Sequence, residues 1–148
     1  MSDRDIYDRP LRFNPYHAKV PVKGRLVVVL DGQLTDRGLS LIQQPSRALK
    51  AGEIHELIVT TEAAGPGQCV EEIAYVAFAE ITSGGVALVG DEVIVEGDTL
   101  GHLAGFDETH SPNHLNVVVR SASLRSGAEM GLKLGGEVVI RPGNASLN

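Results

Sequence analysis

The stretch GFDETHSPNHLN, residues 105–116, concentrates side chains that can carry protons or bind metals. It holds two acids, two histidines, two asparagines and one threonine. A connection that only reverses the chain direction is usually built from glycine, proline and small polar residues. We therefore expect a functional site in this stretch rather than a simple turn.

The spacing of the histidines determines which chemistry this site could perform. His110 and His114 are four residues apart, and Asp107 precedes His110 by three. Pro112 lies between the histidines and disfavours a helix, so the three side chains converge only if the chain folds back. Two histidines and a carboxylate form a ligand set for iron, manganese or zinc, with His102 as a candidate additional ligand. We expect a divalent metal ion or, without one, an acid–base site.

Every polar side chain of the stretch has a role in that interpretation. The residues expected for catalysis are Asp107, Glu108, His110 and His114. The expected metal ligands are Asp107, His110 and His114, with His102 as a further candidate. Thr109, Asn113 and Asn116 are expected to bind substrate. The alternative is a polar turn in which Asp107 and Thr109 cap the chain and the histidines lie on the surface. Outside the stretch, His55 alternates with its neighbours in EIHELIV and is expected on the surface of a strand.

Short apolar runs punctuated by glycine surround the polar stretch and predict a mainly β protein. The expected strands are residues 25–31, 38–44, 53–63, 70–81, 84–90, 91–97, 100–106, 114–122 and 132–143. The second of these follows a polar turn and could pair back on the first as a hairpin. Ser46–Gly52 is expected to form one helical turn, and Ser123–Gly131 a short helix that begins at Ser123. This series predicts a single closed or partly open β-barrel with one or two short helices.

The first 16 residues differ from the rest, because they are polar, contain proline and show no periodicity. They hold Tyr7, Phe13 and Tyr16 in a chain with only six phenylalanines and tyrosines and no tryptophan. Aromatic side chains supply large contact areas when they are buried. We therefore divide the chain into an N-terminal arm, residues 1–16, and a β-barrel domain, residues 17–148. The arm is expected to pack on the barrel or on a second subunit, which favours a homo-oligomer.

Composition narrows the class of partners. The 148 residues carry 13 Lys and Arg against 19 Asp and Glu, a formal net charge of −6, and no basic cluster. Nucleic-acid binders usually present a basic patch, so a nucleic-acid partner is not expected. No apolar run approaches the roughly 20 residues of a membrane helix, and the N-terminus lacks the apolar region of a secretory signal. With Cys69 as the single cysteine, these features favour a cytoplasmic protein with a small-molecule ligand.

The C-terminal third, THSPNHLNVVVRSASLRSGAEMGLKLGGEVVI, resembles the end of archaeal CTP-dependent riboflavin kinases, which are cradle-loop barrels. In one alignment the matching residues are Thr109-His110, Leu124-Arg125, Met130-Gly131-Leu132-Lys133 and Gly136-Glu137-Val138. In a second, PNHLNVVV matches a P-G-T-L-N-V segment whose threonine and asparagine hold magnesium. Here Pro112, Leu115, Asn116 and Val117 are retained, and His114 replaces the threonine.

The two alignments exclude one another, because they use the same residues for different strands. KGRLVVVLDGQ does not match the glycine-rich nucleotide motif of these kinases, and the full PGTLN is missing. The resemblance therefore implies a cradle-loop-like fold and argues against kinase activity. The whole chain also resembles uncharacterised small bacterial protein families.

These observations predict a small cytoplasmic β-barrel enzyme or ligand-binding protein with its site in the polar stretch. The alternative is a non-enzymatic barrel module that self-assembles or mediates protein interactions. The position of the histidines separates the two interpretations. In an enzyme they line a site that a ligand can reach, whereas in an assembly module they lie on a flat surface or in a subunit contact.

Overall fold

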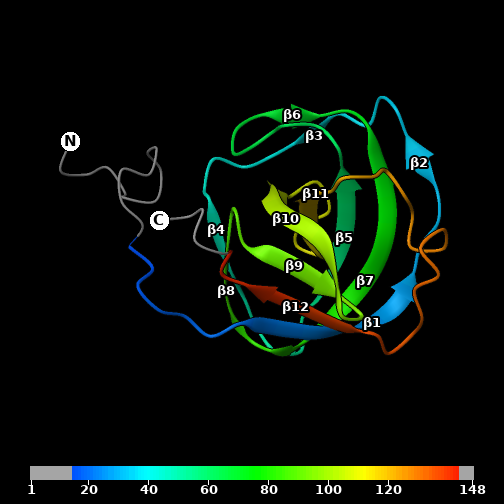
Figure 1. Ribbon diagram of the computed structural model, residues 1–148. Coiled ribbons are helices and arrows are strands. Elements are labelled where there is room, and N and C mark those ends of the chain that lie inside the picture. Colours follow the sequence, from blue (N-terminus) through cyan, green and yellow to red (C-terminus); the bar gives the residue numbers. More distant parts are fainter. Residues whose placement is uncertain (1–14, 144–148) are drawn as a thin grey trace, which may run out of the picture.

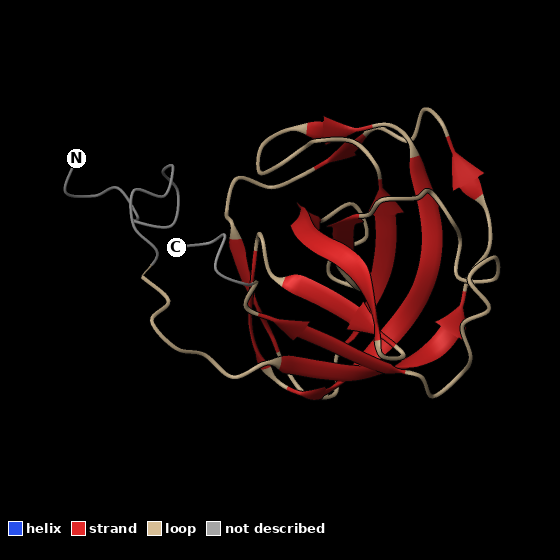
Figure 2. Ribbon diagram, in the orientation of Figure 1, coloured by secondary structure: helices blue, strands red, loops and turns tan. Residues whose placement is uncertain are grey.

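The computed structural model describes residues 15–143 as strands joined by turns and loops (Figure 2). The strands are β1 (Val22–Val29), β2 (Gln33–Leu34), β3 (Leu39–Ser40), β4 (Ser46–Leu49), β5 (Ile54–Thr60), β6 (Cys69–Val70), β7 (Ile73–Ser83), β8 (Gly85–Leu88), β9 (Glu92–Val95), β10 (Asp98–Asp107), β11 (Asn116–Arg120) and β12 (Glu137–Arg141). The expected mainly β architecture is confirmed. The expected helices are wrong, because no helix is found within residues 15–143.

Seven of these strands form a ring (Figure 1). The order is β1-β12-β9-β10-β11-β5-β7, and pairing of β1 with β7 completes the ring. Neighbours are antiparallel except β11 and β5, which run parallel. The β2 strand extends from β7, while β3 pairs with β6 and β4 pairs with β8 in two small separate sheets.

Alternation along the strands builds two apolar cores, one on each face of the sheet. Leu57, Val117 and Phe106 belong to the larger core inside the ring. Ile58 and Val118 are their immediate neighbours along the chain, so they point to the opposite face. On that outer face they pack with residues of the β3–β6 pair into a second core. The outer face of β5, β11 and β10 is therefore covered rather than open to water.

Ser46–Gly52 is not the expected helical turn: Ser46–Leu49 forms β4 and pairs with β8, and the chain turns at Ala51 and Gly52. A segment this short gains little from helical hydrogen bonds, whereas a strand partner satisfies its backbone directly. The expected hairpin of residues 38–44 with the first strand is also wrong. Only Leu39–Ser40 is a strand there, and its partner is β6, about thirty residues further along the chain.

Ser123–Gly131 forms one isolated turn instead of the expected helix. The turn is capped at Ser126 rather than Ser123: the backbone N–H of Glu129 donates to the Ser126 hydroxyl, and that of Ser126 donates to the Glu129 carboxylate. The next residue, Gly127, donates to the carbonyl of Tyr75 on β7 at 3.0 Å. Because the backbone bonds to neighbouring strands here, it cannot continue as a helix, and it leaves the turn at Gly131 with a φ of 71°.

Tyr7 and Phe13, on which the expected docking of the N-terminal arm depends, lie outside the described residues. Within residues 15–143 the chain contains no helix of the length and apolarity required to span a membrane.

Candidate functional site

The β10–β11 loop, residues 108–115, is closed at its base by a buried polar pair. Asp107 ends β10, Asn116 begins β11, and the two residues are paired in the sheet. The Asn116 amide donates to Asp107 Oδ1 at 3.0 Å, and the backbone N–H of Thr109 donates to the same oxygen at 2.9 Å. Asp107 therefore caps the loop, as expected for the polar-turn interpretation. Asn116 Oδ1 is buried and has no hydrogen-bond partner among the described residues.

The register of the sheet extends this pair into a row on the outer face of the ring. Asn116 pairs with Glu56 on β5, Glu56 with Phe78 on β7, and Phe78 with Val28 on β1. Residues paired directly across strands share a face, so these side chains stand side by side with Asp107. Glu56 is a carboxylate in this row, and its side chain is only 8% exposed. A buried carboxylate requires a polar partner.

His114 supplies that partner. Its Nε2 lies 3.2 Å from Glu56 Oε1, its ring contacts the Phe78 ring edge-on at a centroid distance of 5.0 Å, and its side chain is 10% exposed. The other ring nitrogen, Nδ1, lies 2.9 Å from the side-chain amide nitrogen of Asn113. An amide NH₂ can only donate, so Nδ1 accepts and Nε2 carries the proton that is donated to Glu56. The geometry thus selects one tautomer of the neutral imidazole.

His110 lies on the exposed side of this arrangement. Its ring stacks on His114 with a centroid distance of 5.0 Å and an interplanar angle of 26°. The backbone N–H of Asn113 donates to the His110 carbonyl at 2.8 Å, which folds the loop around Pro112 and brings the two rings together. Among the described residues, none donates or accepts a hydrogen bond at the His110 ring nitrogens. These nitrogens therefore remain available to a bound molecule.

The expectation that His55 is a surface residue is wrong. His55 is 9% exposed, and its Nδ1 accepts the backbone N–H of Leu115 at 3.0 Å. Its Nε2 therefore donates to Glu53 at 3.0 Å, so both ring nitrogens are occupied. The N–H of Lys50 and then the His55 ring, as hydrogen-bond donors, hold the pKa of Glu53 below its usual range. His55 thus anchors the end of the loop to β5 and has no free nitrogen for catalysis.

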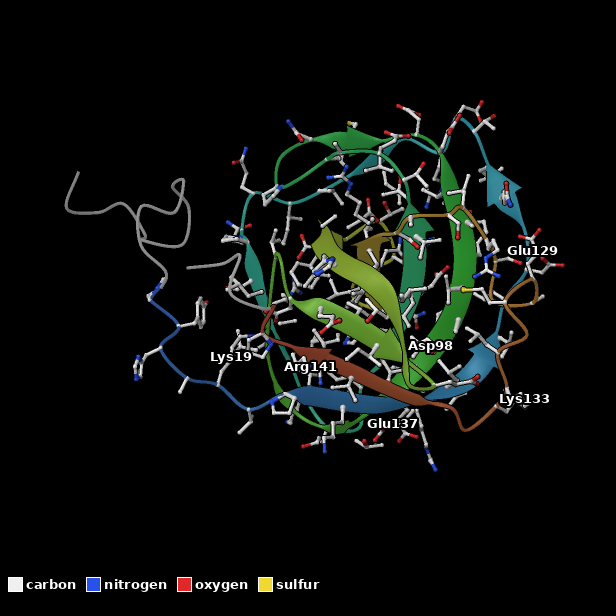
Figure 3. The ribbon with its side chains drawn as sticks, viewed as in Figure 1. Lys19, Asp98, Glu129, Lys133, Glu137 and Arg141 are labelled. Carbon is white, nitrogen blue, oxygen red and sulfur yellow. The ribbon has the colours of Figure 1, made fainter. Side chains whose placement is uncertain are left out.

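The other two residues that the sequence predicted for the loop site are exposed and have structural contacts. Glu108 is exposed and forms an ion pair with Arg47 on β4. Thr109 is exposed and serves the loop through its backbone N–H. Away from these residues, Asp91 is a buried carboxylate that pairs with Lys19, which precedes β1 and is labelled in Figure 3. Asp91 also accepts the backbone N–H of Leu88 at 2.9 Å, so this pair secures the turn between β8 and β9.

The loop does not bring together the expected metal ligands. Residues 15–143 contain no group of three or more histidine, cysteine, aspartate or glutamate side chains placed to hold a metal ion. His114 Nε2 and Asp107 Oδ1 are engaged with Glu56 and Asn116. His102 is exposed and lies five residues before Asp107 on the same strand, which corresponds to about 16 Å. It is too far from the loop to share a metal ion with it.

Glu56 is the component of the site that the sequence analysis missed. It is about sixty residues from His114 in the chain, and only the parallel pairing of β5 with β11 brings the two together. The available signal was weak: a glutamate within the apolar run EIHELIV, at a position that proved to be buried.

Fold and site together define a mainly β protein with a seven-stranded ring and a histidine–carboxylate pair under a loop on its outer face. Residues 16–141 match a family of unknown function (DUF6917), and the chain belongs to this family. No curated protein and no solved structure gives a significant match. The resemblance to riboflavin kinases therefore has no support from these comparisons and stays a prediction.

Proposed function

We propose that the protein is a small acid–base enzyme that binds a small polar molecule over the β10–β11 loop and exchanges a proton with it through His114. Glu56 is the positioning residue, which holds the imidazole in one tautomer and one orientation. His110 and Asn113 are the exposed groups that would contact the bound molecule.

The observation that carries this proposal is the pairing of His114 Nε2 with the buried Glu56 at 3.2 Å. A carboxylate that accepts the N–H of an imidazole fixes the tautomer and stabilises the imidazolium that forms when the other nitrogen takes a proton. Histidine is suited to this role because its ordinary pKa lies near neutral pH. The pair therefore has the arrangement of a general base with its orienting acid.

The proton would be exchanged at Nδ1 of His114. Its hydrogen-bond partner there is the side chain of Asn113, an exposed residue of the loop. A bound hydroxyl or amine can take the place of this amide and donate its proton to Nδ1. The adjacent His110 ring, stacked at 5.0 Å, would hydrogen-bond to a substrate oxygen through a ring N–H.

Hydrolysis of 4-nitrophenyl acetate tests this proposal, because a reactive imidazole cleaves this ester without a dedicated binding site. Glu56→Gln retains the shape and an acceptor for Nε2–H but removes the charge, so we expect the rate to fall about tenfold, within the range for loss of general-base assistance. His114→Gln should lower the rate to that contributed by the exposed histidines, His102 and His110 among them. His102→Gln is the matched control, since His102 is exposed and remote from the loop.

If Glu56→Gln and His114→Gln both hydrolyse the ester at the rate of the parent protein, the proposal is refuted. Asn113→Ala sharpens the test, because removal of the amide exposes Nδ1 and should maintain or raise the rate. An identical assay with EDTA examines the divalent metal ion expected from the sequence, whose removal would lower the rate if the ion participated.

A further inference from the structure

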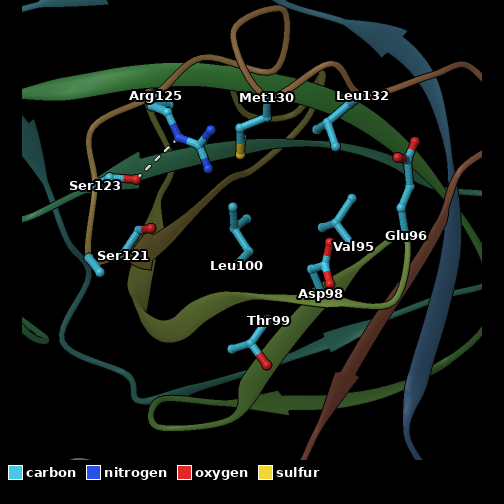
Figure 4. A pocket seen from close by; sticks show the side chains of 11 residues that line it. Val95, Glu96, Asp98, Thr99, Leu100, Ser121, Ser123, Arg125, Met130 and Leu132 are labelled. Atoms are coloured by element: carbon cyan, nitrogen blue, oxygen red, sulfur yellow. Dashed lines mark hydrogen bonds between the residues drawn. The ribbon is translucent and has the colours of Figure 1, made fainter.

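A cavity of about 310 Å³ lies far from the β10–β11 loop, between the β9–β10 turn and the segment of residues 121–132 (Figure 4). It adjoins the beginning of β10 at Asp98, whereas the loop follows the end of this strand at Asp107. The nine residue steps between these ends correspond to about 30 Å. The cavity is therefore a second site, independent of the proposed acid–base centre.

Four large apolar side chains contribute to the lining of the cavity. Leu100 and Val95 come from β10 and β9, and Met130 and Leu132 come from the capped turn and the residues that follow it. Figure 4 shows these four side chains directed toward a common space. A volume of this size is at the lower end of the range for small-molecule sites. More of the exposed lining of this cavity is polar than apolar, which favours a polar or charged ligand.

One side of the cavity is cationic. Arg125 projects its guanidinium toward the space, with Ser123 and Ser121 beside it (Figure 4). Arg125 Nε donates to Ser123 Oγ at 3.3 Å, and no carboxylate within residues 15–143 pairs with this arginine. Its terminal amino groups are therefore available for a carboxylate, which a guanidinium binds through two parallel hydrogen bonds.

The other side of the cavity is acidic. Asp98 and Glu96 lie across the space from Arg125 in Figure 4. Glu96 already accepts the backbone N–H of Lys133 at 2.8 Å, while the exposed carboxylate of Asp98 makes no hydrogen bond or ion pair to any described residue. Asp98 and Arg125, both exposed at the rim of the cavity, form no ion pair with one another.

We propose that this cavity binds a small zwitterion with a carboxylate at one end, a short aliphatic body and an ammonium group at the other end. The carboxylate is held by Arg125 with the hydroxyls of Ser121 and Ser123, and the ammonium group is held by Asp98. An aliphatic acid without the amine satisfies only one side, and an aliphatic amine without the acid satisfies only the other.

Titration of the full chain with 6-aminohexanoate and 4-aminobutanoate, followed by amide chemical shifts, tests this proposal. We expect saturable shifts of residues that line the cavity with at least one of the two probes. Arg125→Gln and Asp98→Asn should each weaken binding by about tenfold, the effect of losing one charged contact. Arg47→Gln is the matched control, because Arg47 pairs with Glu108 at the loop and should leave binding unchanged.

Hexanoate and hexylamine serve as probes that each lack one charge. Both should bind more weakly than 6-aminohexanoate, and Arg125→Gln should affect hexanoate but not hexylamine. Three outcomes would overturn the proposal: no saturable shift with either zwitterion, unchanged affinity in Arg125→Gln, or hexanoate binding as tightly as 6-aminohexanoate. The amide spectrum of each variant without probe shows whether it remains folded.

Discussion

The two ends of β10 carry polar groups in different states. At the loop end Asp107, Asn116, Glu56 and His114 are buried and mostly bonded to one another. At the cavity end Arg125 and Asp98 face a hollow without charged partners among the described residues. Paired and buried groups fix geometry and tautomer, as proton transfer requires, whereas unpaired groups around a cavity have hydrogen-bonding capacity left for a ligand.

The comparison shows why a high density of polar residues in the sequence does not by itself locate a binding cavity. The loop and its ends are rich in such residues because Asp107 accepts from Asn116 and from the backbone of Thr109, and His114 is the partner of the buried Glu56. The cavity has fewer polar residues, and these come from separate parts of the chain. Each end can therefore be disrupted independently.

The largest effect is expected from Gly127→Ala, which should disrupt the cavity end alone. A Cβ at Gly127 would lie 2.0 Å from the carbonyl oxygen of Val76, so the segment that carries Arg125 and Met130 must move away from β7. We expect a loss of at least about 3 kcal/mol in the free energy of unfolding and loss of zwitterion binding. Urea denaturation and the probe titration measure the two effects.

Gly65→Ala is the control for this substitution, because nothing lies within 4 Å of a Cβ there and its φ is not in the left-handed region. It should leave stability unchanged or slightly higher. If Gly127→Ala were as stable as the parent, the close packing of this segment on β7 would be disproved.

Asp107→Ala should produce the second-largest effect, at the loop end. It removes the acceptor of the Asn116 amide and of the Thr109 N–H, and Asn116 is completely buried. We expect a loss of about 2.5 kcal/mol in the free energy of unfolding, from the donors left unsatisfied. Asp107→Asn retains a carbonyl acceptor and should lose less than half of that amount in the same denaturation experiment. Equal losses for the two variants would contradict this account.

A smaller contrast separates the two stacked histidines. His114→Ala leaves the buried Glu56 without its partner and should lower the free energy of unfolding by about 2 kcal/mol. His110→Ala removes only an exposed ring and should change it by less than about 0.5 kcal/mol. Thermal melts of both variants at neutral pH measure the difference. Equal effects would show that Glu56 does not depend on His114.

The strands were predictable because alternation and glycine turns are local properties of the chain. Val70–Ile81 in the sequence analysis, for example, contains most of β7. The helices were wrongly predicted because the helix signals were real but short. Ser126 and Glu129 do cap a turn, yet the hydrogen bond from Gly127 to Tyr75 on β7 prevents this turn from continuing as a helix. That bond depends on tertiary contacts, which no local pattern contains.

The candidate site was predictable only where its members are adjacent in sequence. His110, Asn113 and His114 lie together because one turn around Pro112 brings them into contact. Glu56 could not be predicted, since its position beside His114 results from the register of a parallel strand pair. The same limit applies to the cavity, whose charged residues Arg125 and Asp98 come from segments that only the ring brings together.

The smallest effect concerns the capped turn beside the cavity and is expected to depend on pH. The Ser126 N–H, and secondly the Gln33 side chain, donate to Glu129 and hold the pKa of its carboxyl below the usual range. A carboxyl whose pKa is lower in the folded state stabilises the fold above its unfolded pKa, and this contribution is lost as the pH falls through the folded value. Glu129→Gln should therefore lower the urea midpoint slightly at pH 7, and the difference from the parent should vanish once the pH has fallen through the lowered pKa of Glu129 in the folded state. A difference that persists unchanged at acidic pH would show that the side chain acts through its shape rather than its charge.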